Sequence, residues 1–202
     1  MRIAAWLVAA LCASAATGLA QAAIEWSVER RLTRADFKGR VPATAANASL
    51  SWITIDASWE CDAGALVAAA RATFDPSRSW WRNARGNVWG SAGERMSSSQ
   101  AQQQARRSAL QLDMQLLEHE QLHFDIAEVT VRKIRARFGD FTHACAEAGG
   151  TDPIQQMVAQ ADRELQEEQA RYDRDTGHGA NARAQEQWAR RIKALLERLA
   201  DW

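Results

Sequence analysis

Residues 116–128 read Leu-Leu-Glu-His-Glu-Gln-Leu-His-Phe-Asp-Ile-Ala-Glu, and this stretch decides the interpretation of the chain. Its two histidines, His119 and His123, are four residues apart. On an α-helix they lie about 40° apart around the axis, so both imidazoles can bind one metal ion. Glu120 follows the first histidine; in a zinc peptidase this carboxylate takes a proton from a zinc-bound water whose pKa is lowered to about 7. The spacing therefore predicts a zinc site with Glu120 as the catalytic base.

The sequence around the motif favours a long helix. Residues 97–99 are all serine and can cap a helix, and neither Gly nor Pro occurs from there to Gly139, so we expect one helix, or two joined end to end, over 100–138. The alternative is that the two histidines match the motif by chance on a structural helix. Only four histidines occur in the chain and two of them are here, which favours a real metal site.

Two further helices are expected after this one. Gly149, Gly150 and Pro153 mark a loop, residues 154–171 have helical composition, and residues 173–179 contain two glycines that break the helix. A last helix follows, with an apolar stripe at helical spacing that is more typical of a core-facing surface than of a partner site. The stripe comprises Trp188, Ile192, Leu195, Leu196 and Leu199.

The part of the chain before residue 97 reads as a sheet. In residues 52–59, β-branched and aromatic side chains alternate with polar ones, which predicts a strand. Residues 66–74 are rich in alanine and fit either a helix or a second strand paired with the first; we favour the strand. Residues 82–93 contain three glycines and read as a loop. The fold class expected is α+β and zincin-like: a small N-terminal antiparallel sheet packed on the long motif helix, with further C-terminal helices.

Residues 1–22 are expected to be a cleaved signal peptide. Arg2 is followed by an apolar stretch, and Ala20-Gln21-Ala22 offers the small residues that signal peptidase requires. A membrane anchor is the alternative, but polar residues interrupt the run short of the about 20 apolar residues that span a bilayer. A lipoprotein is less compatible, because Leu11 precedes Cys12 where a small residue is expected. One domain, residues 23–202, remains.

Cleavage would leave two cysteines, Cys61 and Cys145, in a chain bound for an oxidising compartment. We expect them to form a disulfide, the alternative being two separate buried thiols. The 47% hydrophobic content and mean hydropathy of −0.41 exclude a disordered chain and a polytopic membrane protein. With 25 basic and 25 acidic residues interleaved, the sequence also argues against a nucleic-acid partner.

Three segments together resemble a known family. They are the motif run at residues 119–128, Tyr-Asp-Arg-Asp-Thr-Gly-His-Gly at 172–179, and Leu-Thr-Arg-Ala-Asp-Phe-Lys-Gly at 32–39. The chain is similar to the bacterial DUF922 family over nearly all of residues 26–188, including Phe-Asp at 74–75 and Ser-Trp at 79–80, although Arg34 stands where a Trp is expected. The family is described as predicted secreted zinc-dependent proteases, so the resemblance implies a zinc site more strongly than any substrate.

A catalytic zinc usually has three protein ligands. His178 is the first choice for the third, because it lies on a glycine-flanked loop within the family-like segment. Asp173 is a possible ligand, or could orient an imidazole. Glu128 lies about 140° around the helix from His123, so it can bind the metal only if the helix ends or bends. It fits better as a residue that supports a ligand or as a salt-bridge partner. His143 reads as an exposed surface residue.

Stabilising the oxyanion beside the metal requires a hydrogen-bond donor, and Tyr172, the only tyrosine in the chain, is the candidate. Ordinary packing of its ring is an equally weighted alternative. Trp80, Trp81 and Trp89 flank the glycine-rich loop, where aromatic rings can bind glycans, although core packing is the commoner use. If the strand around Ile53 has an open edge, a peptide could add to it.

The sequence as a whole predicts a periplasmic or secreted zinc metallopeptidase that hydrolyses peptide bonds through a zinc-activated water. His119, His123 and His178 would hold Zn²⁺, while Glu120 and Tyr172 would act in catalysis. A peptide or protein substrate, with the cell envelope as one source, is the expected partner. The alternative is a non-catalytic envelope protein that binds peptide or glycan and has a structural zinc closed by a fourth protein ligand.

Overall fold

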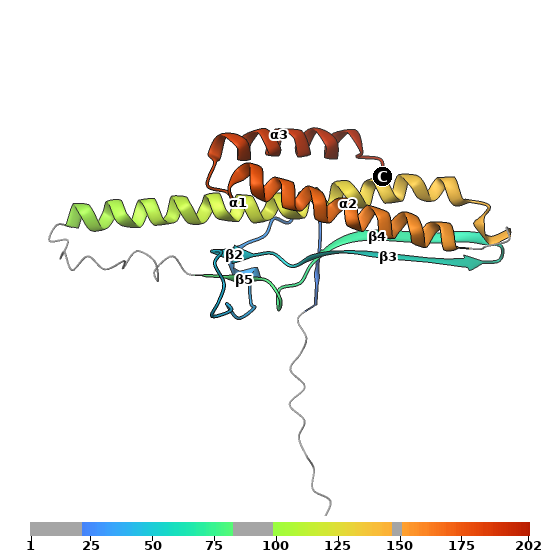
Figure 1. Ribbon diagram of the computed structural model, residues 1–202, viewed down its shortest axis with the longest axis horizontal. Helices are drawn as coiled ribbons and strands as arrows, with labels where there is room; N and C mark the ends of the chain where they lie inside the picture. Colours follow the sequence, from blue (N-terminus) through green and yellow to red (C-terminus); the bar gives the residue numbers. More distant parts are fainter. Residues whose placement is uncertain (1–21, 83–98, 147–150) are drawn as a thin grey trace, which may run out of the picture.

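The computed structural model describes residues 22–82, 99–146 and 151–202. The elements follow one another as strands and then helices, with an antiparallel sheet in the N-terminal part, a long helix and two further helices (Figure 1). The fold is thus α+β, as the sequence predicts. The predicted signal segment, residues 1–22, lies outside the described residues apart from its last one.

The main sheet has the order β1-β4-β3 and is dominated by the hairpin of β3 (Ile53–Asp62) and β4 (Ala65–Phe74). The two strands pair in antiparallel register along their full length, and β1 (Ile24–Glu25) pairs with the end of β4. Both predicted strands are therefore confirmed. Alternate residues of β3 are half-buried and exposed, so one face packs and the other meets solvent.

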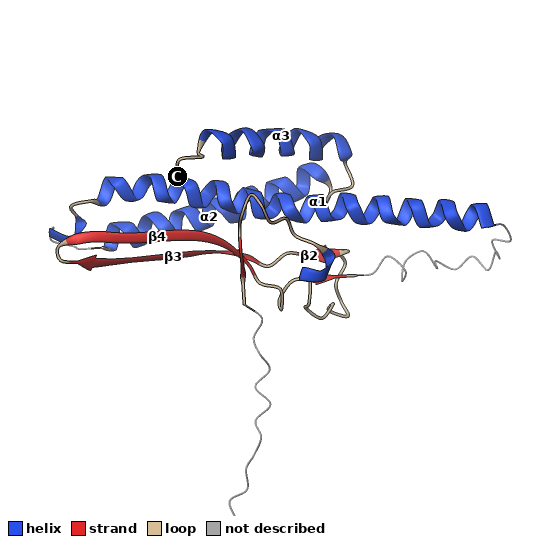
Figure 2. Cartoon of the chain, turned by 180° about the vertical axis from the view of Figure 1, so that it is seen from behind, coloured by secondary structure: helices blue, strands red, loops and turns tan. Residues whose placement is uncertain are grey.

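Helix α1 (Ser99–Phe138) runs across this sheet and forms the centre of the molecule. Its 40 residues correspond to a length of about 60 Å. The C-terminal half is buried against the sheet and the other helices, whereas the N-terminal half extends beyond them (Figures 1 and 2). Leu110, Leu112 and Met114 on that half are more than 60% exposed. Of the two arrangements expected, one helix or two joined end to end, the structure has the single helix, and the motif lies in its buried part.

Helices α2 (Asp152–Thr176) and α3 (Ala182–Arg198) pack on α1 (Figure 1). The break expected at residues 173–179 is wrong by about one turn, because α2 continues to Thr176. The Thr176 hydroxyl donates to the carbonyl of Tyr172, and the following Gly177 adopts the left-handed conformation that closes a helix. Asp173 consequently lies on the last turn of a helix rather than in a loop.

A second, two-stranded sheet joins β2 (Ser49–Leu50) to β5 (Trp80–Trp81). Trp80 and Trp81 are only 6% and 8% exposed, so both rings belong to the core and not to a glycan surface. Trp89, and the predicted loop at 82–93 apart from Arg82, lie outside the described residues. The small sheet therefore serves to place the chain around Ser49 next to α1.

Cys61 and Cys145 form a disulfide that ties the end of β3 to the segment after α1, as predicted. Near it lie two short 3-10 helices, η3 (Gly139–Phe141) and η4 (Ala144–Ala146); a third, η1 (Arg34–Asp36), lies near the N-terminus. Within the described ranges, none of the helices is long and apolar enough to cross a membrane.

Candidate metal centre

The two motif histidines converge on one point beside a cavity. His119 is 2% exposed and His123 is partly buried, and both lie on the packed half of α1. Their Nε2 atoms are 3.1 Å apart. The cavity has a volume of about 420 Å³ and is bounded by residues 46–53, the motif part of α1 and the end of α2. The spacing predicted from the helix period thus brings the two nitrogens together.

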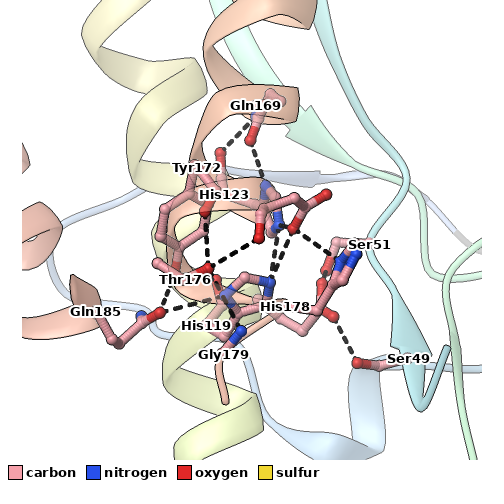
Figure 3. Close-up of polar contacts among 12 residues, drawn as sticks. Ser49, Ser51, His119, His123, Gln169, Tyr172, Thr176, His178, Gly179 and Gln185 are labelled. Carbon is pink, nitrogen blue, oxygen red and sulfur yellow. Dashed lines mark hydrogen bonds and ion pairs between the residues drawn. The ribbon is translucent and has the colours of Figure 1, made fainter. Parts of the chain in front are cut away.

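Asp173 completes a group of three potential ligands. From the last turn of α2, its Oδ1 lies 3.1 Å from His119 Nε2 and 3.0 Å from His123 Nε2. Figure 3 shows how His119 and His123 lie relative to Gln169 and Gln185. Within the described part of the chain, these three side chains are the group whose ligand atoms could hold a metal ion. Three tetrahedral zinc ligands at 2.0–2.1 Å are separated by about 3.3 Å, so the triangle formed here has close to the required size.

Two glutamines fix which ring nitrogens face this triangle. The Gln169 side-chain amide donates to the backbone carbonyl of His123 at 2.9 Å, so its Oε1 is the atom that contacts His123 Nδ1. Gln185 Oε1 lies 3.2 Å from His119 Nδ1. In neutral rings Nδ1 therefore carries the hydrogen, and both Nε2 atoms present lone pairs. Two nitrogen lone pairs and a carboxylate oxygen thus lie 3.0–3.1 Å from one another. A cation between them would stabilise this arrangement, because all three atoms are electron donors.

The pKa shifts of His123 and Asp173 also indicate that the cluster favours positive charge. Burial would lower the pKa of His123, but hydrogen bonding to Asp173 and the charges of Glu120 and Asp173 outweigh it and raise the pKa. Burial would raise the pKa of Asp173, yet the hydrogen bonds from the two histidines lower it well below its usual range. Without a metal ion, the raised pKa of His123 favours a proton on that imidazole, which supplies positive charge beside Asp173.

Glu120 follows His119 on α1 and is 4% exposed. Its Oε1 accepts a hydrogen bond from the Ser49 hydroxyl and its Oε2 accepts one from Ser51, both at 2.5 Å. The residue lines the same cavity as the histidine pair. The base predicted from the motif is thus next to the three potential ligands without being one of them.

Tyr172 lies behind the histidines rather than in the cavity. Its side chain is fully buried and its ring stacks on His119, with centroids 4.6 Å apart. The hydroxyl donates to Gln185 Oε1 at 2.7 Å and is 3.2 Å from the His119 carbonyl, and burial raises its pKa. This placement matches the packing alternative for Tyr172, because its hydroxyl hydrogen is directed to protein groups.

His178 lies at the mouth of the cavity, outside the three-atom cluster. Its side chain is 60% exposed and its Nδ1 is 3.3 Å from Asp173 Oδ1. The backbone at His178 has a positive φ of 53°, between Gly177 and Gly179, which have φ values of 55° and 85°. A Cβ on Gly179 would lie 3.1 Å from His119, so glycine allows this loop to approach the imidazole.

The remaining residues considered as ligands lie elsewhere. Glu128 is 2% exposed and accepts from Arg132 Nε at 2.9 Å and from an Arg135 guanidinium nitrogen at 3.1 Å, which confirms the salt-bridge prediction. His143 is exposed on the segment before Cys145, as expected. A larger cavity of about 880 Å³ lies between the N-terminal segment, α1 and α3, beyond Gln185 and Gly179, and neither motif histidine lines it.

Sequence reasoning missed four residues of this site: Ser49, Ser51, Gln169 and Gln185. Gln169 had one available signal, since it precedes Asp173 by one helical turn and so shares a face of α2 with it. The serines and Gln185 reach the motif from segments more than 60 residues away in sequence, so no local spacing indicates them.

The comparison with protein families supports the resemblance to DUF922 in part. No curated protein and no solved structure matches the chain. The family match includes both the motif helix and the segment with Asp173 and His178, but not the sheet or residues 32–39. Residues 93–179 match the model of the family described as bacterial protein of unknown function (DUF922), so the part of the chain that builds the metal centre is similar to that family.

Proposed function

We propose that the protein is a zinc-dependent metallopeptidase whose zinc ligands are His119, His123 and Asp173. The observation that supports this most strongly is the meeting of His119 Nε2, His123 Nε2 and Asp173 Oδ1 at 3.0–3.1 Å, with the Glu120 carboxylate on the same cavity. Two histidines and a carboxylate form a zinc ligand set that leaves a position for water and substrate. His178, expected as the third ligand from the sequence, becomes a cavity-mouth residue in this proposal.

In the proposed peptide hydrolysis, the residues around the cavity have different roles. Zinc bound there would polarise the scissile carbonyl and lower the pKa of a water molecule. Glu120 is placed to remove the proton from the attacking water and to pass it to the leaving amine. Gln169 and Gln185 hold the imidazoles in the tautomer that binds a metal ion, and Tyr172 supports His119 from behind.

The cavity favours an uncharged part of a peptide or protein chain. Apart from the site residues themselves, its walls are small, amide or aliphatic side chains, including Ala46, Ala48, Ile53, Leu116 and Leu165. The proposed location is the periplasm or the exterior of the cell. The disulfide between Cys61 and Cys145 is compatible with an oxidising compartment.

The test is to compare Glu120→Gln with the unchanged protein for zinc content and for cleavage of a mixed library of internally quenched peptides. We expect about one zinc per chain in both proteins and hydrolysis by the unchanged protein only, reduced at least about 10²-fold by the substitution. His143→Ala, which changes an exposed histidine, is the control. A protein without zinc, or one that cleaves equally well with Gln at 120, contradicts the proposal.

A further inference from the structure

The chain segment around β2 places two serine side chains on the same side. Ser49 is the first residue of β2 and Ser51 directly follows the strand, so the two serines have the spacing that directs side chains of extended chain to one face. Backbone pairing of Ser49 with Trp81 and of Leu50 with Trp80 fixes this segment. Both serines line the cavity of the metal centre. The geometry therefore presents a pair of hydroxyls to whatever lies opposite.

The group opposite is the Glu120 carboxylate, and each hydroxyl takes one of its oxygens. The Ser49 hydroxyl is 2.5 Å from Glu120 Oε1 and the Ser51 hydroxyl is 2.5 Å from Glu120 Oε2. Figure 3 labels both serines beside the histidines. Glu120 is 4% exposed and Ser49 5% exposed, so little water competes for these contacts. Both serines are about 70 residues from Glu120 in sequence, and within the described residues each hydroxyl donates to this carboxylate.

Such a pair of hydrogen bonds has two consequences for a general base. A glutamate side chain has several rotamers, and anchoring both oxygens removes that freedom before the substrate arrives. The two contacts also keep the carboxylate beside the cavity that the serines and the histidine pair line. Each oxygen keeps a second acceptor position, so the contacts do not block proton transfer.

We propose that Ser49 and Ser51 are positioning residues that hold Glu120 in the cavity-facing orientation required for proton transfer. This inference rests on the proposed peptidase function. It assigns to the β2 segment a role in the chemical step in addition to its role as a cavity wall. The serines act through Glu120 and need not touch the substrate.

The experiment uses the zinc-loaded protein and the best cleaved peptide of the quenched library. Ser49→Ala, Ser51→Ala and the double variant are compared for zinc content, KM and kcat. At position 51, Thr and Val form a matched pair, because they have nearly the same shape and only Thr keeps the hydroxyl. We expect each Ala variant to lose about 10-fold in kcat and the double variant about 100-fold, with KM and zinc content unchanged. Ser51→Thr should stay close to the parent, and Ser51→Val should resemble Ser51→Ala.

A second measurement needs neither zinc nor activity. If the serines bind Glu120, the Ser49→Ala/Ser51→Ala pair lowers the urea midpoint of the metal-free protein, and lowers it much less when Glu120 is already alanine. Equal shifts in both backgrounds overturn the inference, as does a double variant with parental kcat or equal losses in Ser51→Thr and Ser51→Val. If the unchanged protein binds no zinc or cleaves no peptide, the proposed function itself fails, and this role for the serines fails with it.

Discussion

Replacing Asp173 by alanine should weaken zinc binding far more than replacing His178 by alanine. Asp173 Oδ1 lies 3.1 and 3.0 Å from the two imidazole nitrogens, so this substitution deletes one of the three proposed ligands. Four-ligand structural zinc sites bind with about 10–16 kcal/mol, which gives about 3–4 kcal/mol for each ligand. Loss of Asp173 should therefore raise the Kd for zinc by about 10²- to 10³-fold.

The expected effect of His178→Ala is smaller because His178 contacts the ligand and not the three-atom cluster. Its Nδ1 is 3.3 Å from Asp173 Oδ1 and its side chain is 60% exposed. Partners that orient a metal ligand are worth about 10- to 100-fold in affinity, and an exposed, long contact belongs at the lower end. We expect about a 10-fold rise in Kd.

The assay is a competition titration of zinc against a fluorescent chelator, with protein purified without a histidine tag. His143→Ala serves as a control for the loss of a histidine outside the site, and far-UV circular dichroism verifies that each variant retains its helices. A 10²-fold loss in His178→Ala with little loss in Asp173→Ala would refute the assignment and restore His178 as the third ligand. Losses of 10²-fold in both would indicate a four-ligand, closed site, as expected for a non-catalytic binding protein.

Three further predictions concern other residues. Gly179→Ala should lower the free energy of unfolding by about 1–3 kcal/mol and weaken zinc binding, because its φ is 85° and the new Cβ would lie 3.1 Å from His119; unchanged chemical denaturation would contradict this. Tyr172→Phe should keep kcat within about 10-fold, since the hydroxyl is directed to Gln185 and not to the cavity, whereas a 10²-fold loss would favour the oxyanion role. Burial would raise the pKa of Asp36, but hydrogen bonds from Thr33 and the ion pair with Arg30 lower it, so its contribution is present above pH 3.8 and is lost as the pH falls through the lowered pKa. Asp36→Asn should therefore destabilise the protein at pH 7, by about 1 kcal/mol or less, and not at pH 2, as urea unfolding at the two values would show.

The elements predicted correctly are those whose signals are local and repeated. The alternation in residues 53–60 matches the period of a strand, and the absence of Gly and Pro before Gly139 permits a helix of 40 residues. The histidine pair follows from the same helical period. These features depend on neighbours within a few residues, and the structure leaves them unchanged.

The features that sequence reasoning missed depend on where segments meet. The third-ligand prediction favoured His178 because residues 173–179 were expected to be a loop, in which a histidine between glycines could fold back. In the structure α2 continues through Asp173, and the helix directs that carboxylate to α1 while His178 remains at the mouth. An error of one turn at the end of a helix thus changes which side chain is favoured as the third potential ligand.

The end of α2 also explains the composition of the segment at residues 172–179. Tyr172 and Asp173 are adjacent on the helix, so one stacks behind His119 while the other faces the two Nε2 atoms. The Thr176 hydroxyl binds the Tyr172 carbonyl, and the backbone then reverses through three residues with positive φ. Gly179 has to be small because it contacts His119. The helix end thus provides a potential ligand, a ring behind His119 and a close approach of the backbone. Each of these roles requires its residue type at its position, so this segment and the histidine motif form one site together.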